Sequence, residues 1–122
     1  MRYSRNGMPV VFVIATDWKL RAAVRAELRE RGMDALGMDS PADAGRVLAQ
    51  GTMPNAAVLE ATAHLADDPA IQGLVKRVPT VLVASRTETV LLPEVAAVFY
   101  RPVSVGDIVS KVSEILARGQ AA

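Results

Sequence analysis

Glu60 is the residue whose type and position most directly suggest chemistry. It ends the run AAVLE (residues 56–60), in which four apolar residues lead into a carboxylate. A short continuous apolar run of this kind is typical of a strand that is buried on both faces. The neighbouring sequence contains no cationic residue that would pair with the acid. The role of Glu60 therefore depends on which side chains the fold brings to the end of that strand.

Other chemically active residue types are scarce. The chain has no cysteine, which excludes a disulfide framework, a thiolate nucleophile and a cysteine-ligated zinc site. His64 is the single histidine, and we expect it to be an exposed loop residue rather than a ligand. A P-loop and a glycine-rich dinucleotide-binding turn are also missing. The sequence predicts no catalytic residue, no metal site and no cofactor.

Composition limits the classes of partner. The chain has 122 residues and 51% hydrophobic content, which suits one compact domain with a core of its own. Its 14 basic and 13 acidic residues nearly cancel, so whole-chain charge indicates neither nucleic acid nor a membrane surface as partner. No apolar run approaches the length of a bilayer span, and the absence of cysteine fits a reducing compartment. We expect a cytoplasmic domain.

Apolar runs alternate with helical patterns along the chain. The expected strands are residues 10–15, 35–38, 56–60, 80–84 and 95–100. Helical periodicity with capping signals predicts helices over residues 20–31, 41–50, 67–77 and from 105 onwards. The expected N-caps are Asp17, Ser40, Asp68 and Ser104.

This alternation predicts an α/β fold with one open parallel sheet and helices on both of its faces. Sites in such sheets form at the carboxyl ends of the strands. The order of elements brings these residues towards one edge: Ala15, Thr16, Asp17, Glu60, Ala84, Ser85 and Arg101.

The chain resembles the receiver domain of response regulators, the module of two-component signalling. The resemblance rests on VIATDWKLR, AAVLEA, VPTVLVAS and FYRPVS, and it runs from about residue 10 to residue 118. It implies a flavodoxin-like, five-stranded sheet of order 2-1-3-4-5 in which helices three and four are shortened. Residues 1–9 are then an N-terminal extension and residues 119–122 a C-terminal tail.

The positions that carry phosphotransfer in that family are all substituted. Ala15 and Thr16 stand where the family has an acidic pair, Glu60 where it has the acceptor aspartate, Ala84 where it has a hydroxyl residue, and Arg101 where it has a lysine. Mg²⁺ requires charged oxygen ligands, which Ala15 and Thr16 do not supply. The resemblance therefore implies a degenerate site in which Arg101 pairs with Glu60, and it implies a cis peptide bond before Pro102. Glu60 is then either a built-in mimic of the phosphoryl charge or the product of drift.

Two segments are candidates for a partner surface. Val90, Leu91 and Leu92 lie in a shortened connection, where they are either exposed to a partner or cover the edge of the sheet. Arg21 and Arg25 belong to a basic stripe with Arg29, which either meets an acidic partner or is solvated. Trp18, at the start of the first helix, is expected to be a packing residue.

The sequence thus favours a receiver-like regulatory or protein-interaction domain of bacterial signal transduction that is not an enzyme. The expected partner is a histidine kinase or another signalling protein, and the expected state is a monomer or a weak homodimer, without nucleic acid or membrane. One alternative is a functional receiver that accepts phosphate at a non-standard site. The other is a small α/β nucleotide-binding protein or enzyme.

Overall fold

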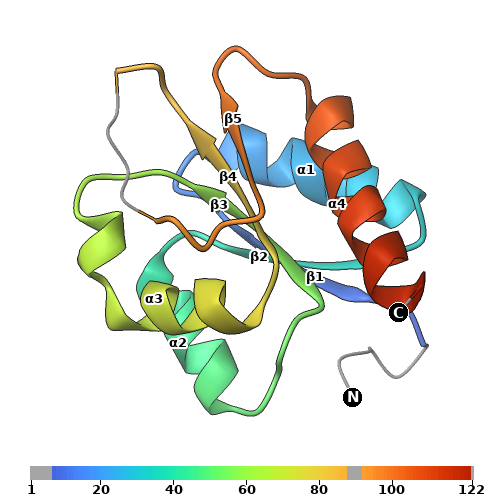
Figure 1. The fold of residues 1–122 in the computed structure, drawn as a ribbon, viewed down its shortest axis with the longest axis horizontal. Helices are drawn as coiled ribbons and strands as arrows, with labels where there is room; N and C mark the ends of the chain where they lie inside the picture. The colour runs from blue at the N-terminus through green and yellow to red at the C-terminus, as the bar shows by residue number, and fades with distance from the viewer. Residues whose placement is uncertain (1–6, 88–91, 122) are drawn as a thin grey trace.

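The computed structural model describes residues 7–87 and 92–121. Five parallel strands form one sheet of order β2-β1-β3-β4-β5 (Figure 1). The strands are β1 (Val10–Ile14), β2 (Asp34–Met38), β3 (Ala56–Glu60), β4 (Thr80–Ala84) and β5 (Ala97–Tyr100). The predicted fold class and strand order are confirmed.

Helices cover both faces of the sheet. They are α1 (Trp18–Glu30), α2 (Pro41–Ala49), α3 (Pro69–Arg77) and α4 (Val105–Ala121), with a short 3₁₀ helix, η1 (Leu65–Asp67). Helices α1 and α4 lie side by side on one face, and α2 and α3 lie on the other (Figure 1). In the part of the chain that the structure describes, no helix is long and apolar enough to cross a membrane.

The alternation of side chains along each strand divides the core into two layers. Phe12, Leu59 and Leu82 pack beneath α2 and α3, whereas Val13 and Val58 pack beneath α1 and α4. All five residues of β1 are buried. Continuous apolar strands are required here because helices exclude water from both faces.

The predicted caps begin the helices. Asp17 accepts hydrogen bonds from the backbone N–H groups of Lys19 and Leu20, and Ser40, Asp68 and Ser104 cap the other three helices in the same way. Gly32, with φ of 84°, follows α1 in the left-handed conformation that favours glycine. The Asp17 cap fixes the first turn of α1 at the end of β1, where the candidate site lies.

The connection between β4 and β5 differs most from the prediction. A shortened helix was expected there, but the described residues of this connection, 85–87 and 92–96, contain no helix. Leu92 is buried in the core layer that contains α3, so of its two predicted roles it takes that of covering the sheet and not that of an exposed partner surface. Leu92 covers apolar surface on the side of the sheet where a further helix would have lain. Val90 and Leu91 lie outside the described residues.

Candidate functional site

Three strand ends supply the candidate site. Ala15 and Thr16 follow β1, Glu60 is the last residue of β3, and Arg101 follows β5. Because β4 lies between β3 and β5, the Arg101 side chain spans the end of β4, where Ala84 is buried. The small Ala84 side chain offers no hydroxyl group to what lies above it. The fold thus assembles the predicted positions, as the rule for parallel sheets requires.

The Glu60 carboxylate has a partner on each oxygen. Its Oε2 accepts a hydrogen bond from Nη2 of Arg101 at 2.6 Å, and its Oε1 accepts one from the backbone N–H of Thr16 at 2.8 Å. The backbone N–H of Asp17 donates to the same Oε1 at 3.1 Å. The Glu60 side chain is only 12% exposed. A carboxylate is therefore held inside a cradle of two backbone donors and one guanidinium group.

Asp17 joins this cluster through its second oxygen. While Oδ1 caps α1, Oδ2 accepts from Nη1 of Arg101 at 3.4 Å. The hydrogen bond from the Leu20 N–H lowers the pKa of Asp17 below its ordinary value, and the Lys19 N–H and Arg101 act in the same direction against partial desolvation. Arg101 thus bridges two carboxylates at once.

The predicted pairing of Glu60 with Arg101 is confirmed, and the peptide bond between Arg101 and Pro102 is cis, as the resemblance implied. Sequence reasoning assigned Asp17 only a capping role and missed its contact with Arg101. A signal was present, since an N-cap aspartate directly after β1 must lie at the same sheet edge as Glu60.

The residues of this cluster do not fit Mg²⁺, the ion that the resemblance to receivers would imply. Mg²⁺ takes oxygen ligands and keeps several waters. Ala15 contributes no side-chain oxygen, the Thr16 hydroxyl contacts the Asp39 carbonyl, and the Glu60 and Asp17 carboxylates face the Arg101 guanidinium group. Across residues 7–87 and 92–121 there is no group of three or more His, Cys, Asp or Glu side chains suited to a metal. A cation at this place would face N–H donors and a guanidinium group.

Free space at the centre is also small. A cavity of about 10 Å³ is bordered by Thr16, Asp39, Glu60 and Thr62, among others. This volume is of the order that one water molecule needs. A wider hollow of about 410 Å³ is lined by Arg101 together with Leu20, Val83, Pro102 and Val103. Among the residues that line this hollow, Arg101 alone has a polar side chain.

The basic stripe of α1 is turned towards the sheet. Nη1 of Arg21 donates to the Ala15 carbonyl at 2.6 Å, and Nη2 of Arg29 donates to the Ala35 carbonyl at 3.3 Å. The side chain of Arg25 lies against Gly37 of the edge strand β2, and its Nε is buried. Arg21 and Arg25 are both half-buried, which argues against their prediction as a free partner surface.

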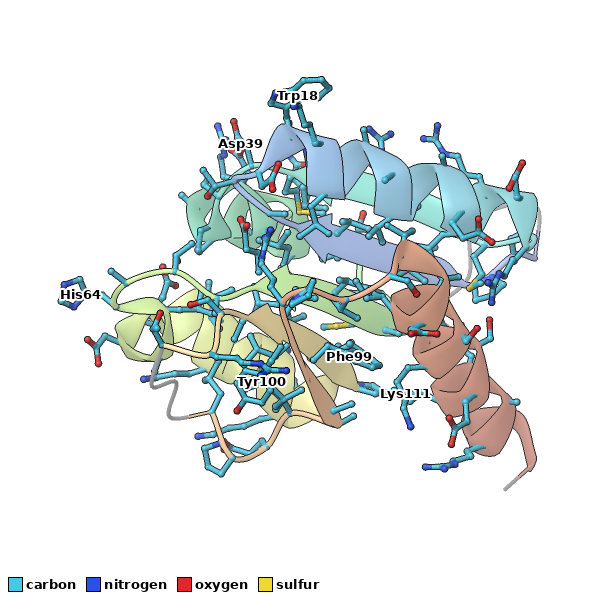
Figure 2. All side chains as sticks on the ribbon, turned by 90° about the horizontal axis from the view of Figure 1, so that it is seen from above. Trp18, Asp39, His64, Phe99, Tyr100 and Lys111 are labelled. Carbon is cyan, nitrogen blue, oxygen red and sulfur yellow. The ribbon has the colours of Figure 1, made fainter. Side chains whose placement is uncertain are left out.

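Several aromatic and apolar side chains are exposed instead. Trp18 is 63% exposed and stands out from the start of α1 in Figure 2, so the expectation that it packs in the core is wrong. Val98 and Tyr100 of β5 are also exposed, on the strand next to the connection that lacks a helix in its described residues. His64 is an exposed loop residue, as expected (Figure 2).

Solved structures share this fold. A response regulator receiver protein from Burkholderia phymatum is 19% identical, with a TM-score of 0.74 over 89% of this chain and 95% of that one. A CheY-like response regulator receiver domain protein from Methanospirillum hungatei JF-1 is 15% identical, with a TM-score of 0.76 over 93% and 98% of the two chains. A response regulator receiver domain protein from Clostridium thermocellum is 10% identical, with a TM-score of 0.76 over the same shares.

No family model and no curated protein matches the sequence. At these identities the structural likeness establishes the fold, which is that of response-regulator receiver domains.

Proposed function

We propose that this chain is a receiver-like regulatory domain that works through protein contacts and without phosphotransfer. The observation that carries the proposal is the occupied cradle at the strand ends. The Glu60 carboxylate accepts from Arg101 and from two backbone N–H groups in the space where a receiver would hold its phosphoryl group and metal. Phosphotransfer needs a free carboxylate oxygen and charge neutralisation by a metal, and this cluster favours neither.

The same cluster supports a domain with one stable arrangement. Glu60 is held by the start of α1 and by Arg101 in the loop after β5. A switched receiver gains and loses the negative charge of a phosphoryl group, whereas here the negative charge is the permanent carboxylate of Glu60. Ala84 has no hydroxyl group through which a change at Glu60 would pass to β4. A site of this kind supplies a constant surface to other proteins.

A protein partner fits the exposed side chains. Trp18, Val98 and Tyr100 present large apolar surface to solvent, and aromatic residues are enriched in the buried centres of protein interfaces. The partner class that follows from the receiver fold is a histidine kinase or another cytoplasmic signalling protein. This domain would take part in signalling by binding, not as an enzyme.

The experiment is incubation of the purified domain with acetyl phosphate and Mg²⁺, followed by intact mass spectrometry. We expect no phosphoryl adduct, whereas an active receiver domain in the same reaction provides the positive control. The melting temperature of the domain should also be unchanged by Mg²⁺, because a metal that binds only the folded state must raise it.

A phosphoryl adduct on the chain, located by peptide mapping, would overturn the proposal and favour a receiver with a non-standard acceptor. A clear rise in melting temperature with Mg²⁺ would also contradict it, since it would show a metal site among these residues.

A further inference from the structure

The outer face of α1 is the most unusual surface that the candidate site leaves unexplained. Residues three and four apart share a face of a helix, so the exposed Ala22, Ala23 and Ala26 lie together at the middle of this face. Lys19 lies at one end of it and Glu30 at the other, and both are exposed. The alanines and these two opposite charges are here called the α1 outer face.

Trp18 borders the α1 outer face on the side towards β2. Arg29 lies on the same border at the far end of the helix, where its guanidinium group reaches the Ala35 carbonyl of β2. Among the described cations, only the Lys19 ammonium lies over the Trp18 ring, at 5.9 Å from the ring centre. An indole left 63% exposed on a helix of small residues is apolar surface that a partner would cover.

We infer that the α1 outer face pairs with a second copy of itself, with the two helices antiparallel. The arrangement of charge along α1 favours this orientation. Antiparallel pairing about a twofold axis between residues 24 and 25 sets Lys19 against the partner's Glu30, and Glu30 against the partner's Lys19. The same register sets Ala23 against the partner's Ala26. Opposite charges therefore meet at both ends, and small side chains meet at the centre, where they let the helices approach closely.

The borders of the face agree with this register. A twofold axis perpendicular to the plane of the two helices keeps each border on its own side, so Trp18 of one copy comes beside the partner's Arg29. A guanidinium group over an indole ring is a favourable cation–π contact. Parallel pairing would instead place Lys19 against the partner's Lys19 and Glu30 against the partner's Glu30, which repel each other.

The contact is small and its ion pairs are exposed. Stable interfaces bury about 1,200 Å² or more, and one helix face against another lies at the low end of that scale. Exposed ion pairs contribute little to stability because water and salt screen them. The dimer is therefore weak and reversible, with a dissociation constant in the high micromolar range.

Charge exchange tests the register. Sedimentation velocity is measured from micromolar to millimolar concentrations on the wild-type domain and on Lys19→Glu and Glu30→Lys. Each single substitution puts like charges opposite each other twice in the dimer, so we expect the dissociation constant to rise about tenfold. The double variant Lys19→Glu/Glu30→Lys should recover wild-type association. An equimolar mixture of the two single variants should form a heterodimer with the affinity of the wild-type dimer, although each variant alone self-associates about tenfold more weakly.

Trp18 supplies a second measurement, because it is the only tryptophan in the chain. Its emission should shift to shorter wavelength as the wild-type concentration rises, and this shift should be absent in Ala26→Arg, whose long charged side chain keeps the two helices apart. Lys76→Glu is the matched control for Lys19→Glu, because it makes the same charge change at an exposed position on α3, on the other face of the sheet. It should leave both measurements unchanged.

A wild-type domain that stays monomeric at millimolar concentration would overturn the inference. Association that is indifferent to the Lys19 and Glu30 substitutions would also overturn it, since the dimer would then use another surface. Because these residues are exposed, a change in fold is not expected, and circular dichroism of each variant checks that the fold is retained. Trp18 also belongs to the partner surface of the proposed function, but the two proposals are tested separately: self-association is measured here, whereas phosphoryl transfer at the strand ends is measured there.

Discussion

Asp17 and Trp18 are neighbours in the chain, but they belong to two regions with opposite properties. Asp17 is part of the cluster at the strand ends, where the two carboxylates and Arg101 all have partners inside the molecule. Trp18 borders the α1 outer face, which consists of exposed alanines between two opposite charges. The first region is closed and the second is open.

The comparison shows where this receiver fold can still respond to its surroundings. In the closed cluster, a new ligand would have to displace Glu60 from the Thr16 and Asp17 N–H groups and from Arg101. On the open face, a ligand displaces only water from apolar side chains, which is favourable. We therefore expect substitutions in the cluster to change stability, and substitutions on the outer face of α1 to change association alone.

The largest effect is expected for Glu60→Lys. The new ammonium group would face the Arg101 guanidinium group and the two N–H donors, in a place that is only 12% exposed. We expect the free energy of unfolding to fall by about 3 kcal/mol, as for other broken ion pairs that are largely buried. Urea denaturation measures it. Glu60→Gln is the control, because its amide oxygen still accepts from the backbone; an equal loss for both variants would show that charge is not the cause.

Arg101→Ala should have the next largest effect. It removes the partner of Glu60 Oε2, but Glu60 keeps its two backbone donors and the Arg101 side chain is 40% exposed. A loss of about 1–2 kcal/mol is expected, in the range for hydrogen bonds to charged groups. Lys111→Ala, which removes an exposed ion pair with Glu114, should cost about 0.5 kcal/mol or less. Similar losses for the two variants would mean that the cluster behaves as an ordinary surface.

A smaller effect is expected from acid. Because folding lowers the pKa of Asp17, its contribution to stability is fully present above the pKa of about 3.9 that it has in the unfolded chain, and is lost as pH falls through the lower folded value. Asp17→Asn should therefore weaken the decline of the unfolding free energy as the pH falls below about 4. Urea titrations across this range compare the two proteins. Parallel pH profiles would show that Asp17 titrates alike in the folded and unfolded states.

The smallest effect on stability is expected for Trp18→Ala. The indole is 63% exposed, so the unfolding free energy measured on dilute, monomeric protein should change by less than about 0.5 kcal/mol. The comparable truncation Phe12→Ala, in the fully buried β1, should cost about 3–5 kcal/mol. A large loss for Trp18→Ala in the monomer would show that the outer face of α1 is part of the folded core and would remove the contrast with the cluster.

The local pattern of the sequence predicts most of the fold because each element carries its own signals. Asp17, Ser40, Asp68 and Ser104 begin helices where their side chains cap the free N–H groups. Apolar runs without polar interruption predict strands between two helical layers. The meeting of Glu60 and Arg101 follows from the same information, because parallel strands bring their carboxyl ends to one edge.

Other features were decided by tertiary packing, which a local pattern does not contain. Leu92 is buried because the described residues between β4 and β5 form no helix, so this loop residue covers apolar core. Arg21 and Arg25 were expected on a solvated or partner-binding stripe, but the nearness of β1 and β2 gives them backbone to lie against.

The sequence by itself determined the alternation of strands and helices, the starts of the helices and the absence of side-chain carboxylates at Ala15 and Thr16, while the strand order was implied by the resemblance to receiver domains. The tertiary structure alone decided that Asp17 shares Arg101 with Glu60 and that Trp18 stays in solvent. The physical reason is that capping and periodicity act within a few residues along the chain. Whether a side chain is paired or exposed depends on what distant segments place beside it, and here β5 brings Arg101 to Asp17 while no described segment covers Trp18.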